Sequence, residues 1–115
     1  MTTKVEPSAR QHRIRALNDR LRRTHAGGLV MVTSGIRAMG EDAMRELLEA
    51  VAHFDAFGPD NDPWGEHDMG SLGFQGRRVF WKIDYYDAQL AGSSPDPADP
   101  QVTRRVLTIM LAEEY

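Results

Sequence analysis

The sequence predicts an α+β domain in the order α-β-α-β-β-α, with a small antiparallel sheet packed against helices. Two segments carry apolar residues at helical spacing, one short run is rich in β-branched residues, and two alternating segments flank Gln75-Gly76. The sheet would contain this C-terminal hairpin and the one earlier strand. Because 115 residues suit one domain, we expect a single domain over 1–115, with 1–7 as a disordered tail.

Composition narrows the classes of protein to consider. The hydrophobic content of 41% is ordinary for a globular chain, and no apolar run reaches the roughly 20 residues that span a bilayer. The first residues lack the apolar stretch of a secretory signal, and the absence of cysteine excludes a disulfide scaffold and a thiolate zinc site. We therefore expect a cytoplasmic protein that does not bind membranes.

Charge is distributed unevenly along the chain. Residues 1–25 hold seven basic and two acidic side chains, whereas the remainder is acidic and the whole chain carries a net charge of -3. A basic arm of this kind can bind nucleic acid or an anionic membrane. We interpret it instead as docking on its own domain, because an acidic body with a pI of about 5.8 disfavours nucleic-acid binding.

The first helix is expected to start at Ser8, which forms a capping-box pattern with Gln11. A narrow apolar stripe follows among arginines, and Gly27-Gly28 ends the helix. The run 29–33 is rich in β-branched residues and lies between glycines and Ser34-Gly35, so it predicts a strand buried on both faces.

A second helix is predicted after a turn, or a single helical turn, over 34–40. Glu41 and Asp42 supply the negative charge that a helix N-terminus favours. A broad apolar face then repeats at i, i+3, i+4, i+7 and i+10, formed by Met44, Leu47, Leu48, Val51 and Phe54. Gly58-Pro59 marks the end of this helix.

The hairpin permits a prediction of register. A two-residue turn at Gln75-Gly76 pairs Phe74 with Arg77. One face is then apolar and predicts core residues: Leu72, Phe74, Val79, Trp81, Ile83 and Tyr85. The opposite face pairs Ser71 with Phe80, Met69 with Lys82 and His67 with Asp84, with Tyr86 beyond.

A last helix is predicted from Asp99-Pro100, an N-cap followed by proline at the first helical position. It would follow a Pro-rich and acidic loop over 87–100 and would be apolar over most of its circumference. Glu113 and Glu114 have the wrong sign for a helix C-terminus. We expect Arg22 and Arg23 of the first helix to compensate them.

Four blocks of sequence together resemble a known family: 60–70, 79–87, 94–100 and 103–115. The chain is similar, from about Asn18 onward, to short bacterial proteins grouped as a domain of unknown function, family 3768. Trp64 and Met69 stand where Tyr and Phe are expected. The resemblance implies a proteobacterial protein, often encoded beside plasmid and other mobile-element genes, and it assigns no role to any residue.

The candidate site is the acidic turn and the polar face of the hairpin. Its members are Asp60, Asp62, Trp64, Glu66, His67, Asp68, Phe80, Lys82, Asp84 and Tyr86. An EF-hand reading fails because Ser71 stands at position twelve, where a bidentate Glu is required.

Two interpretations of these side chains stay open. A divalent metal could be held by His67 and Asp84 with one of Asp60, Asp62 or Asp87. Alternatively, the turn carboxylates cap backbone amides, and His67 and Asp84 form a cross-strand pair.

Two functions match these interpretations. The first is a binding or regulatory protein of mobile elements that acts by protein contact, for example on a host or defence factor, without a cofactor. Phe80 and Tyr86 beside Lys82 would form its contact surface. The alternative is a metal-dependent hydrolase that uses His67, Asp84 and carboxylates of the 60–68 turn. We favour the first, because the sequence holds no nucleophile motif, phosphate loop or dinucleotide fingerprint.

Overall fold

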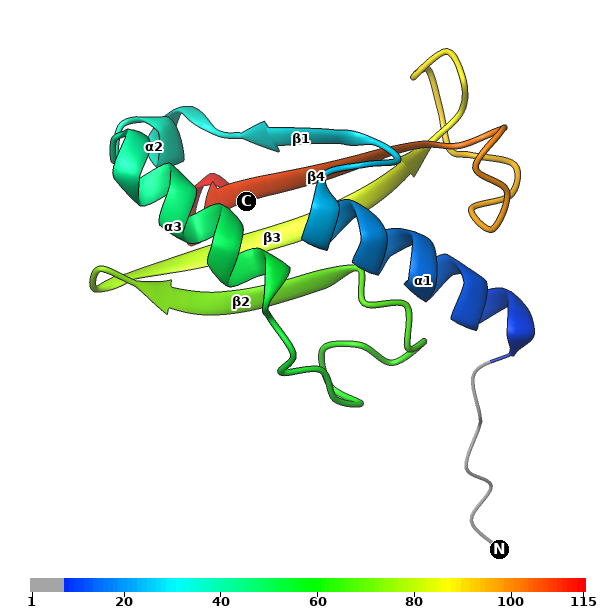
Figure 1. Ribbon diagram of the computed structural model, residues 1–115, viewed down its shortest axis with the longest axis horizontal. Helices are drawn as coiled ribbons and strands as arrows, with labels where there is room; N and C mark the ends of the chain where they lie inside the picture. Colours follow the sequence, from blue (N-terminus) through cyan, green and yellow to red (C-terminus); the bar gives the residue numbers. More distant parts are fainter. Residues whose placement is uncertain (1–7) are drawn as a thin grey trace, which may run out of the picture.

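The computed structural model describes residues 8–115, which form a mixed α and β domain (Figure 1). The expected disordered tail at 1–7 lies outside the described residues. The elements in chain order are α1 (Ala9–Thr24), β1 (Leu29–Val32), α2 (Ser34–Arg37), α3 (Glu41–Ala52), β2 (Met69–Phe74), β3 (Arg77–Tyr86), β4 (Arg104–Leu111) and the 3-10 helix η1 (Ala112–Glu114). The α+β class is confirmed.

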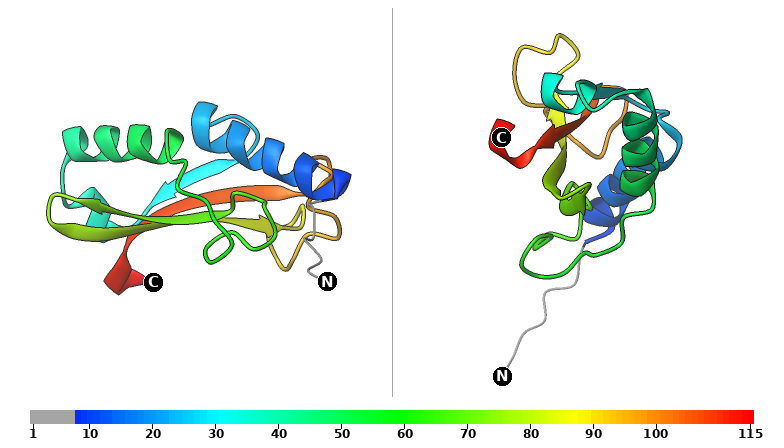
Figure 2. Two further views of the ribbon diagram at one scale, coloured as in Figure 1. Left: turned by 90° about the horizontal axis from the view of Figure 1, so that it is seen from below. Right: turned by 90° about the vertical axis from the view of Figure 1, so that its left-hand side faces the viewer.

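The sheet has four strands in the order β1-β4-β3-β2. β2, β3 and β4 are antiparallel neighbours, and β1 runs parallel to β4, so the sheet is mixed where an antiparallel one was expected. The helices α1 and α3 cover one face, and the chain ends on the other side of the sheet (Figure 2). None of the described helices has the length and apolar character needed to cross a bilayer.

The predicted last helix is wrong, because its residues form β4. Asp99 and Pro100 lie in a turn in which the Asp99 side chain accepts from the N–H of Gln101 at 2.9 Å. β4 lies inside the sheet and is buried on both faces along most of its length. A short apolar run buried on all sides has no period that separates strand from helix, and the β-branched residues of this run favoured a strand.

The register predicted for the hairpin is confirmed from Phe74 with Arg77 to Met69 with Lys82. Gln75 and Gly76 have φ angles of 50° and 75°, as a tight hairpin turn requires. The predicted core face of the hairpin is also confirmed: Val79, Trp81 and Ile83 are buried, and the other three members pack against the core partly buried.

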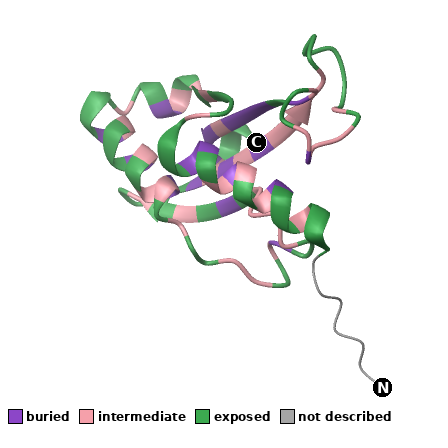
Figure 3. Ribbon diagram, turned by 45° about the vertical axis from the view of Figure 1, so that its right-hand side comes forward, coloured by how far each residue is buried: buried purple, intermediate pink, exposed green. Residues whose placement is uncertain are grey.

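β1 was expected to be buried on both faces, and this is wrong. Leu29 and Met31 are 51% and 55% exposed, whereas Val30 and Val32 pack against the core. The cause is its position: β1 is an edge strand, and helices cover only one side of the sheet. Figure 3 shows buried residues concentrated in the sheet and on the inner sides of the helices.

The helix signals are confirmed at α1 and in part at α3. The Ser8 Oγ accepts from the N–H of Gln11 at 3.1 Å, and Gln11 Oε1 accepts from the N–H of Ser8 at 2.7 Å. The segment 34–37 forms the single helical turn α2, and α3 ends at Ala52, before Gly58.

The arginines of α1 do not neutralise the C-terminal glutamates. Glu113 pairs with Arg77, and Glu114 accepts from the hydroxyl of Thr33. Arg22 instead reaches the C-terminus of α3, where negative dipole charge and free carbonyl groups favour a cation. The basic helix therefore does dock on its own domain, at a different helix end.

Candidate functional site

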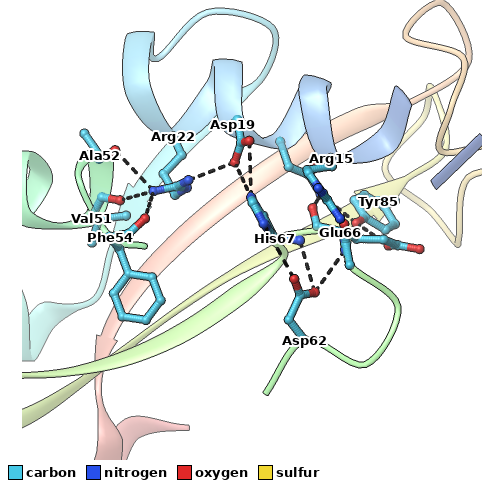
Figure 4. A network of polar contacts seen from close by, with 12 residues as sticks. Arg15, Asp19, Arg22, Val51, Ala52, Phe54, Asp62, Glu66, His67 and Tyr85 are labelled. Atoms are coloured by element: carbon cyan, nitrogen blue, oxygen red, sulfur yellow. Dashed lines mark hydrogen bonds and ion pairs between the residues drawn. The ribbon is translucent and has the colours of Figure 1, made fainter. Parts of the chain in front are cut away.

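The acidic turn belongs to a loop, residues 58–68, that lies against α1 (Figure 4). Asp62 is buried, and its Oδ1 accepts from the N–H groups of Glu66 at 2.9 Å and His67 at 3.1 Å. This is the amide-capping role that one of the two interpretations gave to the turn carboxylates. Asp60 is exposed and takes no such role.

His67 pairs with α1 and not with Asp84, so the predicted cross-strand pair is wrong. Its Nδ1 lies 2.9 Å from Asp19 Oδ1, and its Nε2 lies 3.8 Å from Asp62 Oδ2. The ring stacks on Phe57 with 3.8 Å between centroids. His67 has a left-handed φ of 55°, and the pairing of β2 with β3 begins at Met69, so the ladder that would have placed His67 opposite Asp84 does not extend that far.

Asp19 joins this histidine to a buried arginine. Its Oδ1 accepts from the Arg22 guanidinium at 2.8 Å. Burial of the Asp19 carboxyl opposes its ionisation, but the hydrogen bonds from Arg22 and His67 outweigh burial and hold the pKa below its ordinary value. The Asp19 carboxylate thereby holds the 58–68 loop through His67 and also holds Arg22, which caps α3.

A second group of polar contacts holds the same loop further along α1. The Nδ2 group of Asn18 donates to the Glu66 carbonyl at 3.0 Å and to the Tyr85 hydroxyl at 2.8 Å. Tyr85 donates in turn to Glu66 Oε1 at 2.8 Å, and Arg105 Nε donates to Asn18 Oδ1 at 2.8 Å. Burial raises the pKa of the Tyr85 hydroxyl, which keeps it a donor. Glu66 is therefore engaged within the domain.

The surroundings of Asp68, in contrast, disfavour its ionised form. Its carboxyl is partly buried beside Glu66, and burial followed by the charge of Glu66 raises its pKa. Trp64, in contrast, is 65% exposed. Of the loop residues proposed for binding, Trp64 and Asp60 are the ones whose side chains face solvent.

Of the proposed metal ligands, His67 and Asp62 lie near each other, with 3.8 Å between Nε2 and Oδ2, whereas Asp84 and Asp87 make other contacts. His67 contacts Asp19, Asp84 forms an ion pair with Lys82 at 2.9 Å, and Asp87 accepts from the N–H groups of its own loop. Across residues 8–115, no three His, Cys, Asp or Glu side chains form a group that could hold a metal ion. The described residues therefore do not bring His67, Asp84 and a turn carboxylate into one group.

The other half of the candidate site lies on the sheet face opposite α1 and α3, which we call the open face. The strand register places these side chains there: Leu29, Met31, Met69, Ser71, Phe80, Lys82, Asp84, Tyr86, Thr108 and Met110. A shallow cavity of about 450 Å³ lies among Lys82, Tyr86 and Thr108, with Tyr115 on its wall. The Tyr115 ring meets Phe80 edge-on at 5.8 Å between centroids.

The predicted separation of the hairpin into two faces is correct for β3. Phe80, Lys82, Asp84 and Tyr86 lie on the face away from the helices, and each is partly exposed. The hydrogen bond to Asp84 raises the pKa of the Lys82 ammonium.

Sequence reasoning missed two groups of residues. Asn18 and Asp19 were given no contact, and Arg22 was assigned to the C-terminal glutamates, although Asp19 and Arg22 have the i, i+3 spacing of an ion pair. Thr108 and Met110 were assigned to a helix and so could not be placed on the open face. The exposed side of β1 left no signal in the sequence, because Leu29-Val30-Met31-Val32 is apolar at every position.

The family comparison matches most of this structure. The model of a family described as a protein of unknown function, DUF3768, matches residues 32–114. The chain belongs to this family. The DUF3768 match includes the 58–68 loop, the hairpin and β4, whereas Asn18, Asp19 and Arg22 precede it.

Further comparisons add no activity to the DUF3768 assignment. No curated protein and no solved structure matches the chain significantly. The chemistry of this DUF3768 protein must therefore be argued from its own residues.

Proposed function

We propose that this protein is a small binding or regulatory protein that acts by protein contact through the open face. The observation that carries the proposal is the mixture of exposed apolar and charged groups on a sheet face that α1 and α3 leave uncovered. Leu29, Met31 and Met69 are exposed there, and Tyr115 is 75% exposed over Phe80.

The chemistry of this surface suits a protein partner. Aromatic residues and methionines are enriched at protein interfaces, and exposed apolar groups gain most when a partner removes them from water. The Lys82–Asp84 pair lies between the apolar groups and can exchange its mutual contact for polar groups of a partner.

The basic residues of α1 favour a protein partner over nucleic acid. Arg13 Nε donates to the Ala98 carbonyl at 2.7 Å, and Arg15 Nε donates to the Gly65 carbonyl at 2.5 Å. Arg10 pairs with Asp96 at 3.0 Å, and Arg22 is fully buried. Four of the six arginines of α1 therefore have partners within the domain, which reduces the positive charge available to phosphates.

The setting proposed for this activity is the bacterial cytoplasm. The resemblance to mobile-element proteins supports a role in modulating a host or defence factor. No cofactor is required for such a role, because the protein would act through occupancy of its partner.

Affinity capture from a bacterial lysate, treated with nuclease, tests the proposal. Thr108→Arg places a large cation in the cavity of the open face, and it should reduce capture of a specific protein at least tenfold. Ala16→Arg makes the same charge change on an exposed position of α1 and should leave capture unchanged. Capture that survives Thr108→Arg, in a variant that melts like the parent, would exclude the open face.

A further inference from the structure

β1 has the sequence of an interior strand but lies at the edge of the sheet. Leu29-Val30-Met31-Val32 contains no charge and no proline. Exposed edge strands are usually protected by a charged residue, a proline or a bulge, because their unpaired backbone groups can bind another strand. With Leu29 and Met31 exposed on one side and two valines on the other, an added strand would find apolar neighbours on both of its faces.

β1 has backbone N–H groups that are free to pair with such a strand. The N–H of Thr33 donates to the Ile109 carbonyl of β4 at 3.1 Å. Because successive N–H groups of a strand alternate in direction, those of Val30 and Val32 point away from β4. Within residues 8–115, no backbone group or side chain pairs with these two N–H groups.

A groove lies along the same edge. Its volume is about 630 Å³, and it separates β1 from α3. Val30, Val32, Met44 and Leu48 form an apolar lining, and all four pack partly buried against the core. Side chains of a strand paired with β1 would alternate between this groove and the open face beside Leu29 and Met31.

The rim of the groove indicates the charge of its occupant. His25, Arg37 and Arg45 line it together with Glu41. Arg37 and Arg45 are exposed, and Arg45 forms an exposed ion pair with Asp42 at 3.0 Å, a weak contact that an acidic group of an occupant can replace. An acidic side chain in the occupant would complement the rim.

We propose that this groove binds an extended segment of a partner protein, which pairs with β1 as a fifth strand of the sheet. Its alternate apolar side chains occupy the groove, and an acidic side chain faces Arg37 and Arg45. The proposal rests on the proposed function in one respect, that the partner is a protein, and it adds how part of that partner is held. Strand addition of this kind takes affinity from backbone hydrogen bonds and specificity from the pockets for alternate side chains.

A second copy of this chain fits the groove less well. A two-fold contact between two β1 strands would place both grooves on the same side of the joint sheet, with the basic rims facing one another. Four residues also span only about 13 Å, which is little surface for a stable dimer.

The probe for this proposal is a phage-displayed library of random 12-residue peptides, selected on the full chain, with a selected peptide then synthesised. We expect enriched sequences that alternate apolar residues and contain Asp or Glu. Val32→Pro removes one outward N–H without removing a hydrogen bond of the sheet, and it should weaken peptide binding at least tenfold. On peptide addition, amide hydrogen exchange at Val30 and Val32 should slow.

Two further variants keep the test decisive if Val32→Pro unfolds the chain. Reversal of both rim arginines, Arg37→Glu with Arg45→Glu, alters exposed side chains and should weaken an acidic peptide at least fivefold. Ala16→Arg, on an exposed position of α1, should leave peptide binding within twofold of the parent.

Several results would overturn the inference. The selection could enrich no peptide, or amide hydrogen exchange at Val30 and Val32 could stay unchanged with peptide bound. The parent could also be a dimer that Val32→Pro converts to a monomer. A captured partner that is lost with Thr108→Arg but kept with Val32→Pro and the rim reversal would uphold the open face and exclude strand addition. If every variant captures the same proteins as the parent, both proposals fail.

Discussion

The Nδ1 atom of His67 lies 2.9 Å from Oδ1 of Asp19, and this contact fastens the 58–68 loop to α1. The same carboxylate holds Arg22, whose NH1 group donates to the Val51 and Phe54 carbonyls at 2.8 Å each. One acidic side chain of α1 therefore links a loop on one side to the end of α3 on the other. The histidine that suggested chemistry in the sequence is one partner in this link.

The first prediction concerns Asp19 and pH. Asp19→Asn should lower the free energy of unfolding by about 1.5–3 kcal/mol near pH 6, since hydrogen bonds to a charged group contribute about that much. The pKa of Asp19 is lowered in the folded state from the ordinary 3.8. Its contribution is therefore complete above the ordinary pKa and is lost as the pH falls through the lower folded value. Urea unfolding of parent and variant at pH 6 and pH 3 measures the difference, which should shrink at pH 3.

Asp42→Asn is the matched control for this measurement. Asp42 pairs with Arg45 at 3.0 Å with the same i, i+3 spacing in a helix, but its side chain is 91% exposed. A surface pair of this kind should change the free energy by about 0.5 kcal/mol or less. Equal effects of the two substitutions would mean that the Asp19 link does not hold the loop.

The second prediction separates two neighbouring arginines. Arg22→Met should reduce the free energy of unfolding by about 3 kcal/mol or more, because it leaves the carbonyl groups at the end of α3 and the Asp19 carboxylate without their cation. Arg23→Met, at an exposed position of the same helix turn, should change it by about 0.5 kcal/mol at most. Thermal melting of both variants is the measurement, and similar losses would contradict the capping role.

Local patterns predicted the parts of the fold that local physics decides. The capping box at Ser8, the apolar face of α3 and the hairpin register depend on neighbours within a few residues or across one turn. The path of the chain just before Met69, where the pairing of β2 begins, was not predictable in this way. His67 leaves the strand because Asp62 and Asp19 hold it elsewhere. Asp19 is distant in the sequence, and no local pattern marked the contact with Asp62.

The prediction of a helix where the structure has β4 failed for a different reason. The residues of β4 are apolar enough to fill a helix, and only the pairing with both β3 and β1 decides that they form a strand. Because β4 was predicted as a helix, its residues could not be placed on the open face. The edge position of β1 was hidden as well, since among the described residues β1 pairs with β4 alone. The surfaces proposed for binding therefore required the topology, whereas the face that Lys82 and Asp84 share followed from the hairpin register alone.

The third prediction tests packing between β2 and the end of α3. A Cβ atom on Gly70 would lie 2.6 Å from Trp81 Nε1 and 2.7 Å from Phe54 Cε1. Gly70→Ala should therefore cost about 1–3 kcal/mol of stability. Gly73→Ala, in the same strand, meets nothing within 4 Å and should be neutral or slightly stabilising. Chemical unfolding distinguishes them, and equal stability of the two variants would be inconsistent with this packing.

The last prediction is a substitution that stabilises the protein. The pKa of Asp68 is raised from the ordinary 3.8, first by burial and then by the charge of Glu66. The folded state therefore binds a proton more readily than the unfolded state, so ionised Asp68 costs stability at neutral pH and this cost disappears as the pH falls through the raised value. Asp68→Asn removes the charge at nearly constant volume and should raise the free energy of unfolding at pH 7 by roughly 0.5 kcal/mol or more.

The pH dependence of this gain identifies its origin. Near pH 3, Asp68 is protonated in the folded parent, so parent and Asp68→Asn should unfold with nearly the same free energy. Asp60→Asn, at an exposed position of the same loop, should give no gain at either pH. A gain from Asp68→Asn that persists unchanged at pH 3 would have to come from packing or hydrogen bonding of the amide, and a loss at pH 7 would show that the ionised carboxylate supports the loop.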